Sequence, residues 1–169
     1  TTLFRSLSNL KELIKKGSKE IVLSGINIGD YGIVEGKRSN DFYTLLQKIN
    51  NEIKNIRIRI SSIEPNLLSN EIIKLIGESE IFVNHFHIPL QSGSNKILNR
   101  MSRRYTSELY EERVKYIKKL MPYSCVGGDV IVGFPGEDSN EFDKTLEFIK
   151  NLDMSYLHVF PYSERANTR

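Results

Sequence analysis

Small residues and hydrogen-bonding side chains follow the short apolar segments of this 169-residue chain. The positions that stand out are Gly25, Asn27, Ser62, Gln91, Ser92, Gly133, Phe134, Pro135 and Tyr162. Glycine lets the backbone approach a ligand closely, and amide or hydroxyl groups then hold that ligand by directed hydrogen bonds. Glu64 and Glu137 lie in such loops too, but they offer too little for the paired groups of acid–base catalysis. These residue types predict a binding site for a polar small molecule.

The strands and helices that would carry these loops alternate regularly along the chain. Short apolar runs alternate with segments of helical period, which is typical of βα units with a parallel sheet. The predicted strands are 21–26, 57–62, 85–91, 129–134 and 156–160, and the predicted helices are 7–16, 41–51, 69–78, 107–120 and 140–152. Ser69 and Asp138 are signals for helix starts, and Gly17 and Pro122 are signals for helix ends. The segment 32–40 is expected to be an exposed loop. In parallel α/β folds the ligand lies at the carboxyl ends of the strands, where the loops would meet.

Alternation within the predicted strands separates the side chains onto two faces. In the strand at 85–91, apolar side chains occupy one face, while His85, His87 and Gln91 occupy the other. Asp129 likewise lies opposite Val130. A doubly wound sheet or a closed eight-stranded barrel would give both faces a largely apolar character. We therefore predict one α/β domain built as a wide, incomplete barrel, with a polar inner face that admits a ligand.

In this order and spacing, the loops resemble the methylthiotransferase branch of the radical S-adenosylmethionine (SAM) enzymes. The similarity runs from Glu20 to Thr168, and its most specific pieces are LQSGS at 90–94 and VIVGFPGE at 130–137. The resemblance implies a partial (βα)6 TIM-like radical SAM barrel. In that family a 4Fe-4S cluster reduces SAM to a deoxyadenosyl radical, and sulfur and then methyl are added to an adenine carbon of tRNA.

The resemblance also implies which parts of the family's architecture residues 1–169 leave out. The family binds its cluster through a CxxxCxxC loop after the first barrel strand, and three thiolates are needed for such a site. This chain has a single cysteine, Cys125, and its first predicted element is a helix. We therefore expect a barrel core that lacks its first strand and cluster-binding loop. The N-terminal methylthiotransferase domain and the C-terminal RNA-binding domain of the family are also expected to be absent, and the fragment alone to be inactive.

By resemblance, Gln91 and Ser92 bind the ribose or methionine part of SAM, although a strand-terminal capping role is the alternative. Asn27 lies where the family binds the methionyl amino group, and the alternative is a turn-forming asparagine. Arg103 corresponds to an arginine that could pair with the cofactor carboxylate, and the alternative is a solvated charge.

The loop at 133–137 would pass beneath the adenine of SAM, and Gly133, Phe134 and Pro135 are its predicted contacts. Gly25, Ser62 and Tyr162 complete the expected cofactor-binding set. Catalytic residues cannot be assigned from the sequence.

Less specific sequence features indicate the substrate. Glu64-Pro65, the loop at 29–32 and the segment at 163–168 resemble enzymes that modify threonylcarbamoyl-adenosine beside the tRNA anticodon. The isopentenyl-adenosine branch usually has His-Pro in place of Glu64-Pro65. We predict that Glu64 and Arg165 contact the substrate, although helix capping by Glu64 and a surface position for Arg165 are open alternatives. The remaining alternatives are the isopentenyl-adenosine branch, the branch that modifies a ribosomal protein, and a cluster-free barrel that binds a nucleotide or RNA.

The histidines raise the question of a metal site. His85 and His87 share a strand face, and His158 could supply a third ligand. Histidines in a polar barrel more often form hydrogen bonds with neighbours such as Asp129. We therefore predict no metal ligands in the chain.

Composition sets broad limits. The net charge of +3 and the pI near 8.9 permit RNA binding but do not require it. No stretch approaches the roughly 20 apolar residues of a membrane-spanning helix. The single cysteine excludes an internal disulfide and agrees with a reducing compartment. We expect a cytoplasmic protein whose partners are SAM and tRNA and not a membrane; the oligomeric state, the sulfur donor and the exact tRNA set stay open.

Overall fold

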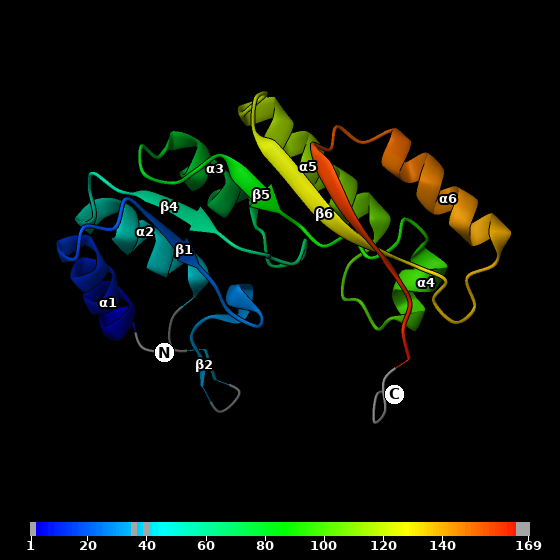
Figure 1. Ribbon diagram of the computed structural model, residues 1–169, viewed down its shortest axis with the longest axis horizontal. Coiled ribbons are helices and arrows are strands. Elements are labelled where there is room, and N and C mark those ends of the chain that lie inside the picture. Colours follow the sequence, from blue (N-terminus) through cyan, green and yellow to red (C-terminus); the bar gives the residue numbers. More distant parts are fainter. Residues whose placement is uncertain (1–2, 35–36, 39–40, 165–169) are drawn as a thin grey trace.

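The computed structural model of the chain describes residues 3–34, 37–38 and 41–164 (Figure 1). The helices in this part are α1 (Leu3–Lys15), the 3₁₀ helix η1 (Ile28–Asp30), α2 (Phe42–Glu52), α3 (Asn70–Glu78), α4 (Asn95–Arg100), α5 (Ser107–Leu120) and α6 (Ser139–Lys150). The strands are β1 (Glu20–Leu23), β2 (Ile33–Val34), β3 (Lys37–Arg38), β4 (Arg57–Ile60), β5 (His85–His87), β6 (Cys125–Val132) and β7 (Tyr156–Pro161).

The parallel strands follow one another in chain order as β1, β4, β5, β6 and β7 (Figure 1). β1 pairs with β4, and β5, β6 and β7 form a second ladder. The two ladders meet through isolated bridges from Ile58 to Phe82 and from Ser62 to His87. At least one helix separates each of these parallel strands from the next parallel strand, so the predicted open α/β arrangement is confirmed.

Helix ends follow local sequence signals. Ser69 and Asp138 precede α3 and α6, and each side chain accepts a hydrogen bond from a backbone N–H in the first helical turn. Gly17 follows α1 with a φ of +89°, a conformation that costs glycine little. Pro122 follows α5, where it cannot continue the helix. These predicted helix boundaries are confirmed.

The two faces of the sheet differ as alternation predicted. Ile58, Phe86 and Val130 are buried in the hydrophobic core between the strands and the helices. His87 and Asp129 keep 15% and 23% of their side chains exposed on the opposite, concave face. This polar concave face is where a ligand can meet side chains from several strands.

Two strands differ from the predicted bounds. β6 begins at Cys125, whereas residue 129 was predicted as its start. The prediction was too short because Gly127 and Gly128 have low β-propensity. In the structure, the backbone of these two glycines pairs with β5 and β7. β5 ends at His87 instead of residue 91, because Pro89 has no N–H to donate. The chain rejoins β6 through an isolated bridge between Gln91 and Val130.

Other elements were not predicted. The short helix α4 begins after Ser94, which caps it. A β2–β3 hairpin lies within the segment 32–40 that was expected to be an exposed loop. Helix α1 starts at Leu3 instead of residue 7.

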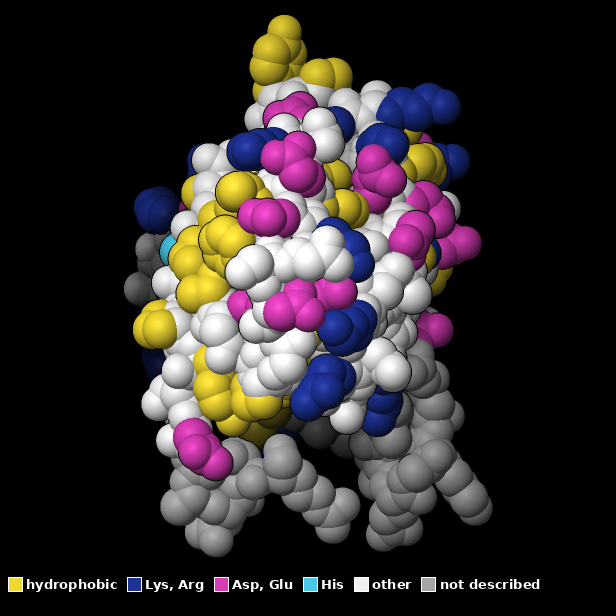
Figure 2. All heavy atoms as spheres, turned by 90° about the vertical axis from the view of Figure 1, so that its right-hand side faces the viewer, with side chains coloured by type: hydrophobic (Ala, Val, Ile, Leu, Met, Phe, Trp, Pro, Cys, Tyr) yellow, Lys and Arg dark blue, Asp and Glu magenta, His cyan; other side chains and the backbone are white. Residues whose placement is uncertain are grey.

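Acidic and basic side chains are interspersed on the face that Figure 2 shows, which is the α4 and α6 side of the molecule. Exposed apolar side chains on α6 include Phe142 and Leu146. In this view basic groups do not gather into one area, which agrees with the small net charge. Within the described ranges, no helix has the length and apolar character needed to cross a membrane.

Candidate functional site

A pocket of about 400 Å³ lies at the carboxyl end of the second ladder. It is lined by Gln91, Asp129, Ile131, Phe134, Phe160, Pro161, Tyr162 and Ser163. Gln91, Phe134 and Tyr162 belong to the predicted cofactor-binding set. The volume lies in the range of small-molecule sites, and the pocket has the position that parallel α/β folds give to their ligands.

Gln91 enters the pocket from an unusual backbone conformation. Its φ is +65°, which lies in the left-handed region, although it is not a glycine. Its N–H donates to the Asp129 carbonyl over 2.7 Å, and its own carbonyl accepts from the Ile131 N–H over 2.9 Å. These two bonds to β6 hold the strained residue, and residues fixed in this way tend to lie at functional sites.

The loop after β6 forms one wall of the pocket. Gly133 and Gly136 have φ values of +76° and +88°. The Glu137 carboxylate accepts a hydrogen bond from the Gly133 N–H and so closes the loop. Phe134 meets Tyr162 edge to face with 5.2 Å between ring centroids. Phe134 of this loop and Tyr162, which follows β7, therefore offer two aromatic rings to a flat ligand.

Polar side chains from three strands form the floor beside this pocket. The Tyr156 hydroxyl lies 3.1 Å from His85 Nε2 and 3.0 Å from His87 Nδ1. His87 Nε2 lies 3.0 Å from Asp129 Oδ2, and His158 Nδ1 lies 3.1 Å from Asp129 Oδ1. The predicted hydrogen bonding between histidines and Asp129 is therefore present.

Burial changes the proton affinities in this floor. It raises the pKa of Tyr156, since the phenolate would lose its hydration. Burial also lowers the pKa of His85, and the positive charge of Arg59 lowers it further. His85 and Tyr156 are therefore held in their neutral forms at pH 7.

Ser92 does not face the pocket, although the sequence predicted that it contacts SAM. Its side chain is fully buried, and its hydroxyl lies 3.0 Å from the Thr145 hydroxyl of α6. The next residue but one, Ser94, forms a hydrogen bond with Glu141 of the same helix. The left-handed turn at Gln91 directs the following residues toward α6. Ser92 therefore anchors the loop to the helix layer.

Arg103 and Glu64, predicted separately for cofactor and substrate, form an ion pair. Arg103 Nη1 lies 3.2 Å from Glu64 Oε1, and 29% and 26% of the two side chains are exposed. The pair joins the loop after β4 to the segment after α4. A carboxylate ligand would have to share the guanidinium with Glu64.

The other predicted residues lie outside the pocket lining. The Asn27 amide donates to Asp30 over 2.6 Å, which is the turn-forming role. Ser62 is exposed after β4 and bridges His87. A Cβ at Gly25 would meet only ordinary contacts at 3.7 Å or more, so close packing does not require glycine there. Arg165 lies outside the described residues.

Some pocket residues were not among those predicted. Asp129, Ile131 and Phe160 line the pocket. Alternation had placed Asp129 on the polar face, and that signal would have been sufficient to include Asp129 among the predicted site residues. Ile131 and Phe160 carried no such signal, because apolar side chains in strands are usually assigned to the core.

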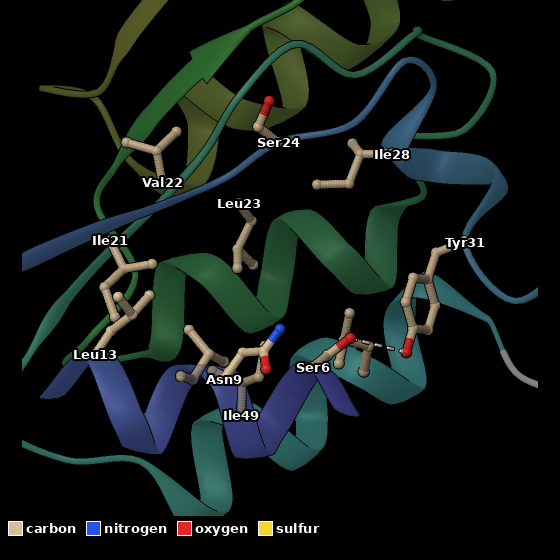
Figure 3. Close-up of a pocket in the computed structure, with 12 residues that line it drawn as sticks. Ser6, Asn9, Leu13, Ile21, Val22, Leu23, Ser24, Ile28, Tyr31 and Ile49 are labelled. Atoms are coloured by element: carbon tan, nitrogen blue, oxygen red, sulfur yellow. Dashed lines mark hydrogen bonds between the residues drawn. The ribbon is translucent and has the colours of Figure 1, made fainter. Parts of the chain in front are cut away.

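A second pocket of about 260 Å³ lies on the helix side of β1 (Figure 3). Ile21 and Leu23 of β1 face Leu13 of α1 and Ile49 of α2 across it. The hydroxyls of Ser6 and Tyr31 lie 3.3 Å apart at its edge. Its lining is predominantly aliphatic and includes none of the predicted site residues, so it is a gap in helix–sheet packing.

A parallel α/β sheet with a polar concave face and a pocket at its strand ends defines a ligand-binding partial barrel. Residues 5–149 match the sequence profile of the Radical SAM superfamily. The chain therefore belongs to the Radical SAM superfamily.

Similar proteins include two tRNA-modifying enzymes. The chain is 46% identical over 163 residues to "Threonylcarbamoyladenosine tRNA methylthiotransferase MtaB" of Bacillus subtilis, covering 96% of this chain and 36% of that protein. It is 42% identical over 161 residues to "tRNA-2-methylthio-N(6)-dimethylallyladenosine synthase" of Clostridium tetani, covering 94% of this chain and 35% of that protein. The chain thus spans about a third of the length of these relatives.

A solved structure shares the fold. The radical S-adenosylmethionine methyltransferase TsrM of Kitasatospora setae, solved with tryptophan and a SAM analogue, matches with a TM-score of 0.74. The match covers 94% of this chain and 30% of that chain at 13% sequence identity. At this identity the comparison shows the fold alone.

Proposed function

We propose that this chain is the SAM-binding core of a tRNA methylthiotransferase that adds a methylthio group to threonylcarbamoyl-adenosine beside the anticodon. The observation that carries the proposal is the 46% identity to the Bacillus subtilis enzyme over 96% of the chain. The pocket at the carboxyl ends of the parallel strands supports it, because a cofactor of this family needs such a site. We place the complete enzyme in the cytoplasm, where tRNA is its macromolecular partner.

We propose that SAM occupies the pocket at the end of β5, β6 and β7. The Gln91 amide can both donate and accept hydrogen bonds, and Phe134 and Tyr162 offer ring surface to adenine. Gly133 and Pro135 shape the loop that carries Phe134. Bound SAM would supply the radical chemistry that modification of the substrate adenine requires. The chain's own contribution is to bind and orient the cofactor.

Further cofactor contacts are proposed for the neighbouring loops. Gly25, Asn27 and Ser62 follow β1 and β4 at the same end of the sheet as the pocket. Arg103 is proposed to bind the methionine carboxylate while it stays in contact with Glu64. Ser92 is proposed to act indirectly, by fixing the Gln91 loop to α6.

The residues of this chain do not fit a 4Fe-4S cluster. Its single cysteine, Cys125, is the first residue of β6, whereas the pocket lies at the other end of that strand. One thiolate cannot replace the three that such a cluster needs. We propose that the cluster ligands lie in a part of the full-length protein outside these 169 residues, along with its methylthiotransferase and RNA-binding domains.

The chemistry of the threonylcarbamoyl group suggests which residues would contact the substrate. The threonylcarbamoyl group carries a carboxylate, and an unpaired charge in a partly desolvated site is costly. Arg165 follows β7 in sequence and is the cation we propose for it. Glu64, held by Arg103, is proposed to face the polar part of the same group.

A deletion strain complemented with the complete gene tests this function. Mass spectrometry of tRNA nucleosides should show the methylthio mark on threonylcarbamoyl-adenosine and leave isopentenyl-adenosine unmodified, with the empty vector as the control. The reverse pattern would assign the protein to the isopentenyl-adenosine branch, for which the 42% identity to the Clostridium tetani enzyme is the argument. No mark on either nucleoside would contradict a tRNA methylthiotransferase.

A further inference from the structure

All three histidines of the chain gather on the concave face around one tyrosine. The rings of His85, His87 and His158 lie 6.0, 5.9 and 5.2 Å from the Tyr156 ring, measured between centroids. They come from β5 and β7, which β6 separates. Three titratable imidazoles on a surface this small indicate a local chemical role.

Two of these histidines flank one carboxylate closely enough that all three residues could hold one ion. His87 Nε2 and His158 Nδ1 lie 3.0 and 3.1 Å from the two oxygens of Asp129, and one ligand atom from each residue can be chosen so that all lie within 4.8 Å. Ligands at about 2.0–2.1 Å from a tetrahedral ion are separated by about 3.3 Å. Binding an ion between them would therefore need only small side-chain movements.

The strand ladder fixes the three ligands. Asp129 and His158 are register partners on β6 and β7, so they stand side by side on the same face. His87 lies on β5 opposite Gly127, two residues before Asp129 on that face. Rigid strands hold a coordination geometry better than loops do.

Charge and hydrogen bonding favour a cation at this point. Across the described parts of the chain, the ion pairs of Asp129 involve His87 and His158 and no lysine or arginine. The Tyr156 hydroxyl contacts Nδ1 of His87, and Nε2 of the same ring is directed at Asp129. In metal sites, a hydrogen bond to the second ring nitrogen commonly orients the ligating imidazole in this way. His158 is 56% exposed, so an ion could enter from that side.

We propose that His87, Asp129 and His158 bind a divalent transition-metal ion of the Zn²⁺ class. Two imidazoles and one carboxylate are a donor set that suits zinc, and they leave a fourth position for water or an oxygen ligand. Asp129 also lines the 400 Å³ pocket, so the proposed site lies beside that pocket. Asp129 completes the site in place of His85, which the sequence had paired with His87. This site does not depend on the proposed methylthiotransferase function.

Metal titration of the 169-residue chain tests the site. After treatment with a chelator, calorimetry with Zn²⁺ and visible spectra with Co²⁺ should show one ion per chain. Asp129→Ala and His158→Ala should abolish binding, and Tyr156→Phe should weaken it by about 10–100-fold. His85→Ala and Cys125→Ser should bind as the unmodified chain does, because neither residue is a proposed ligand.

Circular dichroism of the metal-free variants should show that each is folded, and His158→Ala is the safest ligand variant because that side chain is largely exposed. Absence of Zn²⁺ binding by the unmodified chain would overturn the proposal in favour of a plain hydrogen-bond network. Equal binding by the unmodified chain and folded His158→Ala would overturn it as well. The readout is binding and not activity, so its failure leaves the proposed function intact.

Discussion

The ring of Tyr156 lies directly over Gly127: a Cβ added to Gly127 would come within 2.0 Å of the ring carbon Cζ. The two residues are register partners on β7 and β6. Because Gly127 has no side chain, the ring can cross β6 and place its hydroxyl between His85 and His87 of β5. Gly127, whose low β-propensity caused the start of β6 to be missed in the sequence, therefore allows the polar floor to form.

Gly127→Ala should displace the Tyr156 ring and lower the free energy of unfolding by about 1–3 kcal/mol, as overpacking of a close contact does. Urea unfolding would measure the loss. Gly25→Ala is a matched control, since its Cβ would meet only ordinary contacts, and it should change stability by less than about 0.5 kcal/mol. Equal stability of the two variants would show that the ring moves without cost.

Gln91→Gly removes the side-chain amide that is proposed to bind the cofactor. Glycine readily adopts the left-handed backbone conformation of this residue, whose φ is +65°. In the full-length reconstituted protein, calorimetry should show SAM affinity reduced several-fold, because one hydrogen bond contributes about 0.5–1.5 kcal/mol. Gln91→Ala should lose similar affinity and be no more stable than the glycine variant, since alanine still disfavours this conformation. Unchanged affinity in both variants would remove Gln91 from the cofactor site.

Glu141 should contribute to the acid sensitivity of the fold. Hydrogen bonds from Ser94 and Lys144 hold the pKa of its carboxyl below the ordinary 4.5. The folded state therefore binds the proton less readily than the unfolded state, and the stabilisation present above pH 4.5 is lost as the pH falls through the lowered pKa. Glu141→Gln should flatten this part of the stability curve in urea unfolding at a series of pH values. Glu147→Gln, on the exposed face of the same helix, should leave the curve unchanged.

His85 should titrate below its ordinary pKa of 6.5, since burial and then the charge of Arg59 disfavour its protonated form. The unfolded state then gains protons first as the pH falls below 6.5, so this residue lowers stability in that range. Ring-proton NMR during a pH titration would measure the midpoint. Arg59→Gln should raise the pKa of His85, whereas Lys74→Gln, on exposed α3, should leave it unchanged. A His85 midpoint that does not change in Arg59→Gln would contradict the electrostatic cause.

Several features of the fold followed from local sequence, because their causes are local. Alternation predicted the polar face that carries His87 and Asp129, since successive strand residues always point to opposite sides. Ser69 and Asp138 marked helix starts because a capping side chain acts on backbone groups only a few residues away. Loops after strands predicted where Gln91, Phe134 and Tyr162 would meet, as parallel strands place their carboxyl ends at one edge.

Other features were decided by contacts between residues far apart in the chain. The residues next to Gly127 in sequence give no sign that a tyrosine ring from β7 occupies the space beside this glycine. The start of β6 was therefore missed, and the strand was predicted too short. Gln91 and Ser92 are adjacent and both polar, yet hydrogen bonds to Asp129 and Thr145 direct Gln91 to the pocket and Ser92 to α6. Local patterns along the chain were enough to predict the alternating α/β arrangement and the residue types of the site. Which side chains share a pocket depends on the register between strands and on packing across the sheet, so it is known only from the folded chain.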